Sequence, residues 1–377
     1  MEFVCQKEGL ADGVSTVERI VSTRSTLPII GNILFETTKT GIKLSANNLE
    51  MGIELTVQAK VIKEGSVLIP AKTLGGIVAK LPDGEIGFKL KDKGLITITY
   101  KKSSFNIHGL PPDEFPQMPK VKDPKQFSLE AKLMTEMLKQ TVFATSTSEE
   151  KYVLNGVLIE TGKSAHESSN LRMVATDGYR LAKRGEKIPG LDVLASAIVP
   201  AKALTELLKI LQGRGEGDVS VALGAEQVAF RHKDVYLVSR LIQGQFPDYK
   251  QVIPKSSEVE ITVATSAMLQ AAERAAVIAS QSANIVKLEV RAGTLTLSAQ
   301  APDVGSVEEV VEIESKGKER SSAAFNVRLL ADALKVIDDD KVTLGMGESL
   351  SPGITKPKDG PDYTYIVMPI RTKETAD

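Results

Sequence analysis

The chain has 377 residues, enough for two or three domains, because single cores stop growing at about 250–300 residues and domains most often hold about 100–150. Hydrophobic residues make up 42% and charged residues 25%, which argues against bulk disorder, while an aromatic content of 5% without Trp disfavours stacking on single-stranded bases. The formal net charge of −1 neither indicates nor excludes a nucleic-acid partner, since the clustering of cations matters more than their sum.

The N-terminal segment MEFVCQKEGLADGV lacks the basic and then apolar pattern of a signal peptide. No run of about 18 apolar residues follows anywhere in the chain. Cys5 is the only cysteine, which excludes an intrachain disulfide framework and a multi-cysteine metal site. We therefore expect neither secretion nor membrane insertion, and a cytoplasmic protein.

The first predicted elements are a helix at 16–26 and a hairpin at 32–48, in which two alternating apolar runs flank a turn. Segment 65–90 is typical of a strand that ends at Pro70, an amphipathic helix, a turn and a second strand. Segment 109–119 carries Phe-Pro and then a further proline, which predicts an extended linker because proline biases the backbone toward extended conformations.

The same order of elements recurs about 130 residues later and again near the C-terminus, where Asn326 takes the place of the proline. A period this long indicates whole domains rather than a solenoid. We therefore predict an α+β fold made of three tandem copies of one module with largely antiparallel sheets, divided into domains 1–122, 123–254 and 255–377. The matching elements are helices 131–147 and 266–280, hairpins 155–178 and 286–301, strand–helix–strand segments 195–223 and 321–346, and the linker 242–254.

No set of residues indicates catalysis or a bound cofactor. The histidines His108, His166 and His232 are scattered and have no partner at metal-ligand spacing. GRGEGD (213–218) lacks the Gly-Lys-Ser/Thr ending of a phosphate loop and follows a helix, which favours a turn. Asp177 is a possible general base, but the matching places in the other modules hold SANN and SAQA, which favours a turn role here too. We expect no catalytic residue, no metal and no cofactor.

The predicted helices carry more Lys and Arg than Asp and Glu, although the whole chain is slightly acidic. If these helices share one face, that face attracts phosphates without reading bases. The alternative is that their cations lie on ordinary solvated helix faces. The counted segments are 16–26, 71–80, 131–147, 201–214, 266–280 and 326–336.

Several segments resemble, in order and spacing, the bacterial DNA polymerase III beta subunits, the DNA sliding clamps. The resemblance runs along the whole chain and implies a head-to-tail homodimer that closes into a ring of six similar domains. Helices would line the central hole, through which duplex DNA passes, and antiparallel sheets would lie outside. It implies a noncatalytic, nucleoid-associated subunit that tethers the replicative polymerase and other replication and repair proteins, and that a clamp loader opens. The segments are LSANNLEMGIE (44–54), YVLNGVLIE (152–160), VATDGYRLA (174–182), FPDYKQVIP (246–254) and VMPIR (367–371).

The resemblance also implies which residues face DNA, whereas the residues alone indicate only a basic helix face. Lys72 and Lys202 stand at equivalent places in the repeat. The residues at family positions that face DNA are Arg24, Lys72, Lys80, Tyr152, Lys202 and Lys209.

A further implication is an apolar groove between the second and third domains that binds short peptides with hydrophobic anchors. The chain departs from the family pattern at Tyr179, Gln251 and Ile370, where histidine, arginine and methionine are frequent, so we expect an altered peptide preference. The tail TKETAD continues past the usual end and would lie beside the groove. The matching residues are Leu154, Thr176, Gly178, Tyr179, Arg180, Leu181, Pro247, Val252, Ser351, Val367, Met368, Pro369, Ile370 and Arg371.

Ring closure would join two unlike edges, a heterologous contact that must close or grow into a filament. The segment KKSSFNI (101–107) matches the first-domain edge strand of the family. Basic residues on this edge would face acidic residues on the third domain. The residues implied are Lys101, Lys102, Phe105 and Ile107 on one edge and Val277, Ile278, Glu308 and Glu309 on the other.

Three hypotheses therefore stand. The first is a replicative clamp that encircles duplex DNA. The second is a nonenzymatic DNA-binding relative that coats or bridges duplex without encircling it, so that linear and circular DNA would bind alike. The third is an enzyme that has kept this scaffold, for which the sequence offers no residues.

Overall fold

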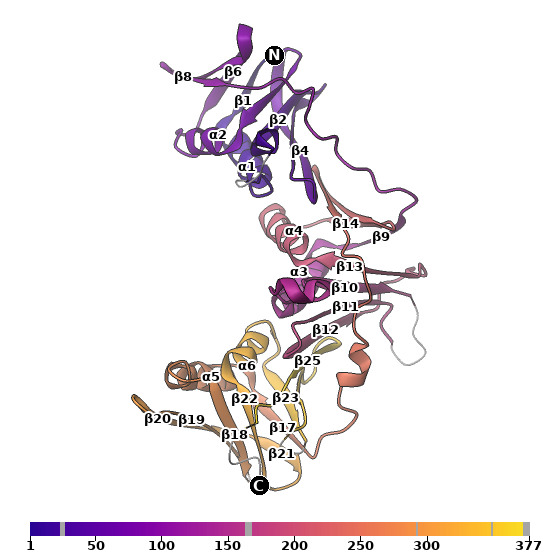
Figure 1. The fold of residues 1–377 in the computed structure, drawn as a ribbon, viewed down its shortest axis with the longest axis vertical. Helices are drawn as coiled ribbons and strands as arrows, with labels where there is room; N and C mark the ends of the chain where they lie inside the picture. The colour runs from indigo at the N-terminus through magenta and orange to yellow at the C-terminus, as the bar shows by residue number, and fades with distance from the viewer. Residues whose placement is uncertain (23–26, 163–167, 292, 348–349, 372–377) are drawn as a thin grey trace. The chain divides into compact units, whose positions relative to one another are not determined.

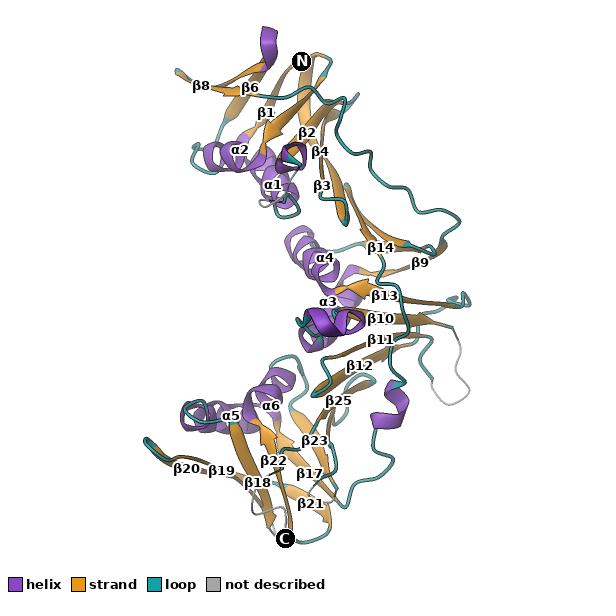
Figure 2. Ribbon diagram, viewed as in Figure 1, coloured by secondary structure: helices purple, strands orange, loops and turns teal. Residues whose placement is uncertain are grey.

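The computed structural model describes residues 1–22, 27–162, 168–291, 293–347 and 350–371. The chain divides into two compact units (Figure 1). Unit 1 consists of residues 1–134 and 202–241, and unit 2 of residues 135–201 and 242–377. Each unit combines antiparallel sheet with helices (Figure 2), which confirms the predicted α+β class. No helix in the described ranges is long and apolar enough to span a membrane.

The helices of the described residues begin close to where the repeat places them, with one exception. The α-helices are α1 Lys7–Glu18, α2 Ala71–Val78, α3 Ala131–Thr141, α4 Ala201–Arg214, α5 Thr265–Ala279 and α6 Val327–Leu334. Short 3-10 helices are η1 Pro28–Gly31, η2 Asp92–Gly94, η3 Val142–Ala144, η4 Glu149–Leu154 and η5 Tyr249–Val252.

Unit 1 is built on one twelve-stranded sheet within the described ranges, whose main path runs β8-β7-β6-β1-β4-β16-β15-β14-β9. Strand β3 pairs with β4, and β2 pairs with β3 and β5. The β2–β3 pair is the hairpin predicted at 32–48. The strands are β1 Glu2–Gln6, β2 Asn32–Thr37, β3 Gly41–Asn47, β4 Met51–Lys63, β5 Ser66–Pro70, β6 Glu85–Leu90, β7 Leu95–Tyr100, β8 Ser103–His108, β9 Lys125–Glu130, β14 Asp218–Leu223, β15 Gln227–His232 and β16 Val235–Arg240.

Unit 2 holds two sheets among its described residues: a nine-stranded one in the order β13-β10-β11-β12-β25-β24-β23-β17-β21 and a four-stranded one in the order β20-β19-β18-β22. The pairs β10–β11 and β18–β19 are the hairpins predicted in the second and third modules. The strands are β10 Gly156–Thr161, β11 Leu171–Thr176, β12 Arg180–Glu186, β13 Ala195–Pro200, β17 Val259–Ala264, β18 Ile285–Arg291, β19 Thr294–Ala301, β20 Gly305–Glu312, β21 Glu314–Gly317, β22 Ser321–Asn326, β23 Lys341–Met346, β24 Gly353–Pro357 and β25 Tyr363–Val367.

The prediction of a helix at 16–26 is wrong, because α1 spans Lys7–Glu18 and lies beside α2 (Figure 1). The stretch before residue 16 contains Gly9 and Gly13, and glycine is a poor helix former. Gly13 faces β3 and β4, where a Cβ would lie 2.6 Å from Val57 Cγ2 and 3.0 Å from Leu44 Cδ1. The missing side chain therefore lets the helix approach the sheet closely.

This shift also corrects the charge prediction for the helices. Lys7 is outnumbered within α1 by Glu8, Asp12 and Glu18, so the first helix is acidic rather than basic. Lys80 lies beyond the end of α2 at Val78. The helices are consequently less basic than the sequence segments indicated, and several cations follow helix ends instead.

Candidate functional site

The turn between β11 and β12 is closed by its own polar groups. The Asp177 Oδ1 atom accepts hydrogen bonds from the backbone N–H groups of Tyr179 and Arg180, at 2.8 and 3.0 Å. The Thr176 hydroxyl donates to the Arg180 carbonyl at 2.6 Å. Gly178 has φ +93°, which favours glycine at this position. The Asp177 carboxylate is thus occupied within a turn, and Tyr179 is carried at the tip with 66% of its surface exposed.

Arg180 fixes this turn to the rest of unit 2. Its Nε donates to Asp177 Oδ2 at 3.0 Å, one terminal nitrogen to Asp332 Oδ2 on α6 at 2.6 Å, and the other to the Phe143 carbonyl at 2.7 Å. The guanidinium also lies over the Phe143 ring, 5.2 Å from its centroid. With its donors engaged in this way, Arg180 positions the turn.

The C-terminal segment passes this turn and is anchored at two places. The Met368 N–H donates to the Tyr179 carbonyl at 2.8 Å, and the Ile370 N–H donates to the Ala324 carbonyl of β22 at 2.7 Å. Met368 and Ile370 are half-buried and Arg371 is exposed. Just before this segment, burial raises the pKa of the Tyr365 hydroxyl well above its ordinary value, and this hydroxyl donates to the Leu329 carbonyl at 2.8 Å.

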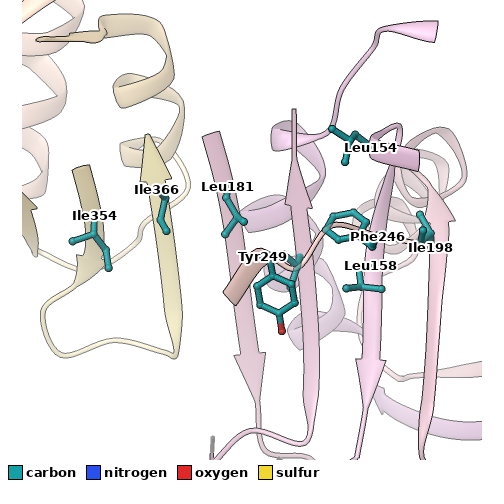
Figure 3. Close-up of a cluster of buried hydrophobic side chains, with 9 residues drawn as sticks. Leu154, Leu158, Leu181, Ile198, Phe246, Tyr249, Ile354 and Ile366 are labelled. Carbon is teal, nitrogen blue, oxygen red and sulfur yellow. The ribbon is translucent and has the colours of Figure 1, made fainter. Parts of the chain in front are cut away.

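A buried apolar cluster underlies these segments. Figure 3 shows Phe246 and Tyr249 against the strands that carry Leu158 and Leu181. Both aromatic residues come from the linker 242–254, here called the second linker. Such a cluster supplies an apolar base for a peptide side chain. Its buried members are Leu154, Leu158, Val174, Leu181, Ile198, Phe246, Tyr249, Ile354 and Ile366, with Val153, Ile242, Val252 and Ile253 packed against it.

The second linker curls rather than staying extended as predicted. Asp248 Oδ1 accepts from the Lys250 N–H at 3.2 Å, Asp248 Oδ2 accepts from Gln251 Nε2 at 2.8 Å, and residues 249–252 form η5. The Tyr249 hydroxyl donates to Glu160 Oε2 at 2.9 Å. Within this linker, Pro247 is exposed and Val252 is half-buried.

The structure therefore brings together residues of the predicted groove from separate segments of unit 2. Leu154, Leu181 and Val367 are buried, which places them beneath the surface as core residues. Thr176, Ser351 and Pro369 are half-buried and Gly178 is exposed. The tail TKETAD lies outside the described residues. Sequence reasoning missed Lys151, whose Nζ lies 5.4 Å from the Tyr179 ring centroid, because the two residues are far apart along the chain.

The predicted DNA-facing residues occur in both units. Lys72 and Lys202 are exposed and each is the second residue of a helix, α2 and α4. Arg328 holds the same place in α6 and is exposed. Sequence reasoning missed it, although the match of Asn326, the N-cap of this helix, to Pro70 and Pro200 could have pointed to it.

The other residues predicted to face DNA differ in whether their side chains are exposed or paired. Lys80 is exposed, and Tyr152, in η4, is 56% exposed. Lys209 is paired with Glu206 at 2.8 Å, and Arg19 donates to the same carboxylate at 2.8 Å. Arg24 lies outside the described residues.

The predicted ring edges are outer strands of their sheets, β8 in unit 1 and β20 in unit 2. On β8, Phe105 is half-buried and Ile107 is buried, while Lys101 and Lys102 precede the strand and are exposed.

On the other edge, Val277 of α5 is 66% exposed, Ile278 is half-buried and Glu308 of β20 is exposed. Arg274 donates to both oxygens of Glu309, at 2.8 and 2.6 Å, and these bonds hold the pKa of Glu309 below its ordinary value.

Comparison with known proteins identifies the family. Models of the N-terminal, central and C-terminal domains of the DNA polymerase III beta subunit match residues 1–119, 128–248 and 250–371 in turn. The chain belongs to the DNA polymerase III beta subunit family. These matches confirm both the resemblance and the three-module fold, and the function is that of a DNA sliding clamp, a noncatalytic subunit.

Individual family members match over nearly their full length. The beta sliding clamp of Synechocystis is 35% identical, with 98% of this chain and 99% of the relative covered. The solved structure of the Bacillus subtilis sliding clamp is 30% identical with a TM-score of 0.91, and covers 99% of both chains. The beta subunit from Thermotoga maritima is 30% identical with a TM-score of 0.90, and covers 98% of this chain and 99% of that one.

Proposed function

We propose that this beta subunit family member acts as a head-to-tail homodimer that closes around duplex DNA and tethers the replicative polymerase and other replication and repair proteins. Helices would line the hole and sheets would form the outside, with three domains per chain at 1–122, 123–254 and 255–377. A clamp loader would open the ring. In this proposal the protein works in the cytoplasm, on the DNA of the nucleoid.

The observation that carries the proposal is the difference between the two outer edges. One edge, around β8, presents Lys101 and Lys102, and the other, around β20, presents Glu308 beside Val277. An exposed strand edge is a template for pairing with another chain. Because the two edges carry opposite charge, each favours the unlike edge of a second copy over its own kind, which is the arrangement of a closed heterologous dimer.

Contact with DNA in this proposal is electrostatic and independent of sequence. Lys72, Lys202 and Arg328 occupy the same place in three helices, so one repeated position supplies a cation from every module. Contacts of this kind bind phosphates without reading bases. A clamp needs this property, because strong base contacts would stall its sliding.

Partner proteins in this proposal bind through a short peptide at the site around Tyr179. Apolar anchors of the peptide would reach the surface over Leu154, Leu181 and Val367, and Met368 and Ile370 would flank them. Tyr179 and Lys151 add an exposed aromatic ring and a cation at the rim. A few buried apolar side chains give binding that is weak enough for partners to exchange.

Sedimentation equilibrium tests the proposal. The chain has a mass of 40.6 kDa, and we expect a particle of twice that mass over a wide concentration range. A stable monomer would contradict the ring, and a mass that grows steadily with concentration would indicate a filament.

A further inference from the structure

The turn at the candidate partner site has a counterpart in unit 1. Between β3 and β4, Asn48 Oδ1 accepts from the backbone N–H groups of Glu50 and Met51, at 3.1 and 2.8 Å, as Asp177 does in the other turn. Leu49 has φ +74° where Gly178 has φ +93°. A leucine rarely adopts this conformation, so the turn is held in the same shape at both places by the bonds around it.

The strands beside the two turns also correspond. Strand β16 pairs with β4 through Met51↔Ser239 and Gly52↔Val238, and β25 pairs with β12 through Arg180↔Val367 and Leu181↔Ile366. The Arg240 N–H donates to the Glu50 carbonyl at 2.9 Å, as the Met368 N–H does to Tyr179. We name residues 47–52 with 236–240 the first platform, and residues 176–181 with 364–368 the second platform.

The linker 109–119, here called the first linker, lies across the first platform and is hydrogen-bonded to it. Asn47 Nδ2 donates to the Gln117 carbonyl at 3.3 Å, and the Tyr236 hydroxyl donates to the Pro119 carbonyl at 3.2 Å. Between these two bonds, the Met118 sulfur occupies the place that a Cβ on Gly52 would take. A cavity of about 10 Å³ remains, lined by residues of the platform, by Gln227 and by Pro119, which is room for about one water molecule.

In the second linker, the side chains of Asp248 and Tyr249 bond within the linker and to Glu160. The residues that correspond to Asn47 and Tyr236 are Thr176 and Thr364, and the Thr176 hydroxyl donates within its own turn. Asp248 caps η5 by accepting the Lys250 N–H, and the Tyr249 hydroxyl donates to Glu160. The same platform is therefore paired with an extended, tethered linker in unit 1 and a curled linker in unit 2.

We propose that the first platform is a second partner site, which the chain's own residues 117–119 occupy as a resident ligand. When this segment is released, the platform accepts a peptide of the same class as the second platform, one with apolar anchors. Met118 is the anchor of the resident ligand, seated where Gly52 leaves room. The inference rests on the proposed function of the second platform as a peptide site.

The test uses a variant that carries Asn47→Thr and Tyr236→Thr, which import the residues of the second platform, together with Met118→Ala. A synthetic peptide with leucine and phenylalanine anchors is titrated by calorimetry against the full-length protein. We expect one peptide per chain for the native protein and two for the triple variant. Met118→Leu, which keeps an apolar anchor and both tethers, is the matched control and is expected to stay at one.

Trypsin cleavage after Lys120 reports release of the linker separately from peptide binding. If cleavage accelerates in the triple variant while the far-ultraviolet circular dichroism is unchanged, and the count of bound peptides stays at the native value, the inference is overturned. A linker that stays protected from trypsin in the triple variant also contradicts the inference. The hydrogen bonds from Asn47 and Tyr236 would then not be what holds residues 117–119 in place. If the native protein binds no peptide, the proposed function fails, whereas a rise from none to one in the variant still supports the first platform.

Discussion

Gly9 and Gly13 lie one turn apart in α1 but have different surroundings. A Cβ on Gly13 would meet Val57 Cγ2 at 2.6 Å, whereas a Cβ on Gly9 would lie at 3.7 Å from Val57 Cγ1, an ordinary contact. Gly13→Ala therefore forces the helix away from the sheet, and we expect the unfolding free energy to fall by about 1–2 kcal/mol.

Gly9→Ala is the matched control. It should gain about 0.5–1 kcal/mol from helix propensity without a clash. Urea denaturation of both variants measures the difference. Equal effects of the two substitutions would show that close packing at Gly13 is not what shapes α1.

Arg180 joins the turn of the candidate partner site to Asp332 and to the Phe143 carbonyl. Its side chain is 12% exposed, and its removal takes a donor away from the Phe143 carbonyl and from Asp177 Oδ2. We expect Arg180→Ala to cost about 2–4 kcal/mol in unfolding free energy and to weaken peptide binding, because the turn that carries Tyr179 is released.

Asp332→Asn removes the charge of only one of the three groups that Arg180 binds, and Asp332 is 42% exposed. We expect this substitution to cost less than about 1 kcal/mol. Thermal and urea unfolding measures the unfolding free energy of both variants, and peptide titration measures their affinity for the peptide. If Arg180→Ala unfolds like the native protein, the role assigned to Arg180 is wrong.

At the scale of elements, the strand hairpins and the helices that follow Pro70, Pro200 and Asn326 were predictable, because alternation and helical spacing are local signals. The position of α1 was not, since the close packing of Gly13 against Val57 and Leu44 joins residues far apart in the sequence.

The groove residues came from the family resemblance rather than from local pattern. Contacts such as Arg180 with Asp332 join residues far apart in sequence, so no spacing rule indicates them. For the same reason the two linkers looked alike in sequence, yet the first bonds to Asn47 and Tyr236 whereas the second curls into η5.

The outer edges lend themselves to a charge-reversal experiment. Lys101→Glu with Lys102→Glu makes both edges of the chain acidic, and Glu308→Lys with Glu309→Lys makes both basic. We expect each double variant alone to be monomeric, because like charges would meet at both interfaces. Mixed together they restore a dimer, since each interface then joins opposite charges.

Sedimentation velocity of the single and mixed proteins measures this outcome. Replacement of Lys187, which is exposed on a loop of unit 2, by Glu serves as a control and should leave the dimer intact. Double variants that dimerise as well alone as in the mixture would contradict the assignment of these edges.

For the whole molecule, the repeat supplies equivalent cations while differences between copies supply the partner site. Lys202→Ala removes one proposed phosphate-binding cation from each chain. We expect the magnitude of the slope of log affinity against log salt to fall by about one for each phosphate that is no longer neutralised. Lys187→Ala should leave this slope unchanged. Fluorescence anisotropy with duplex DNA at several salt concentrations measures it, and equal slopes for the two variants would remove Lys202 from the DNA-facing set.

The central claim is that the protein encircles DNA, and retention on DNA of different topology tests it most directly. Protein loaded onto nicked circular plasmid by a clamp loader is separated from free protein by gel filtration, and the plasmid is then cut once. We predict that the protein remains with the circle and dissociates after linearisation, because a ring slides off a free end. Equal retention on the circular and the linear plasmid would contradict this account and favour a protein that coats duplex without encircling it.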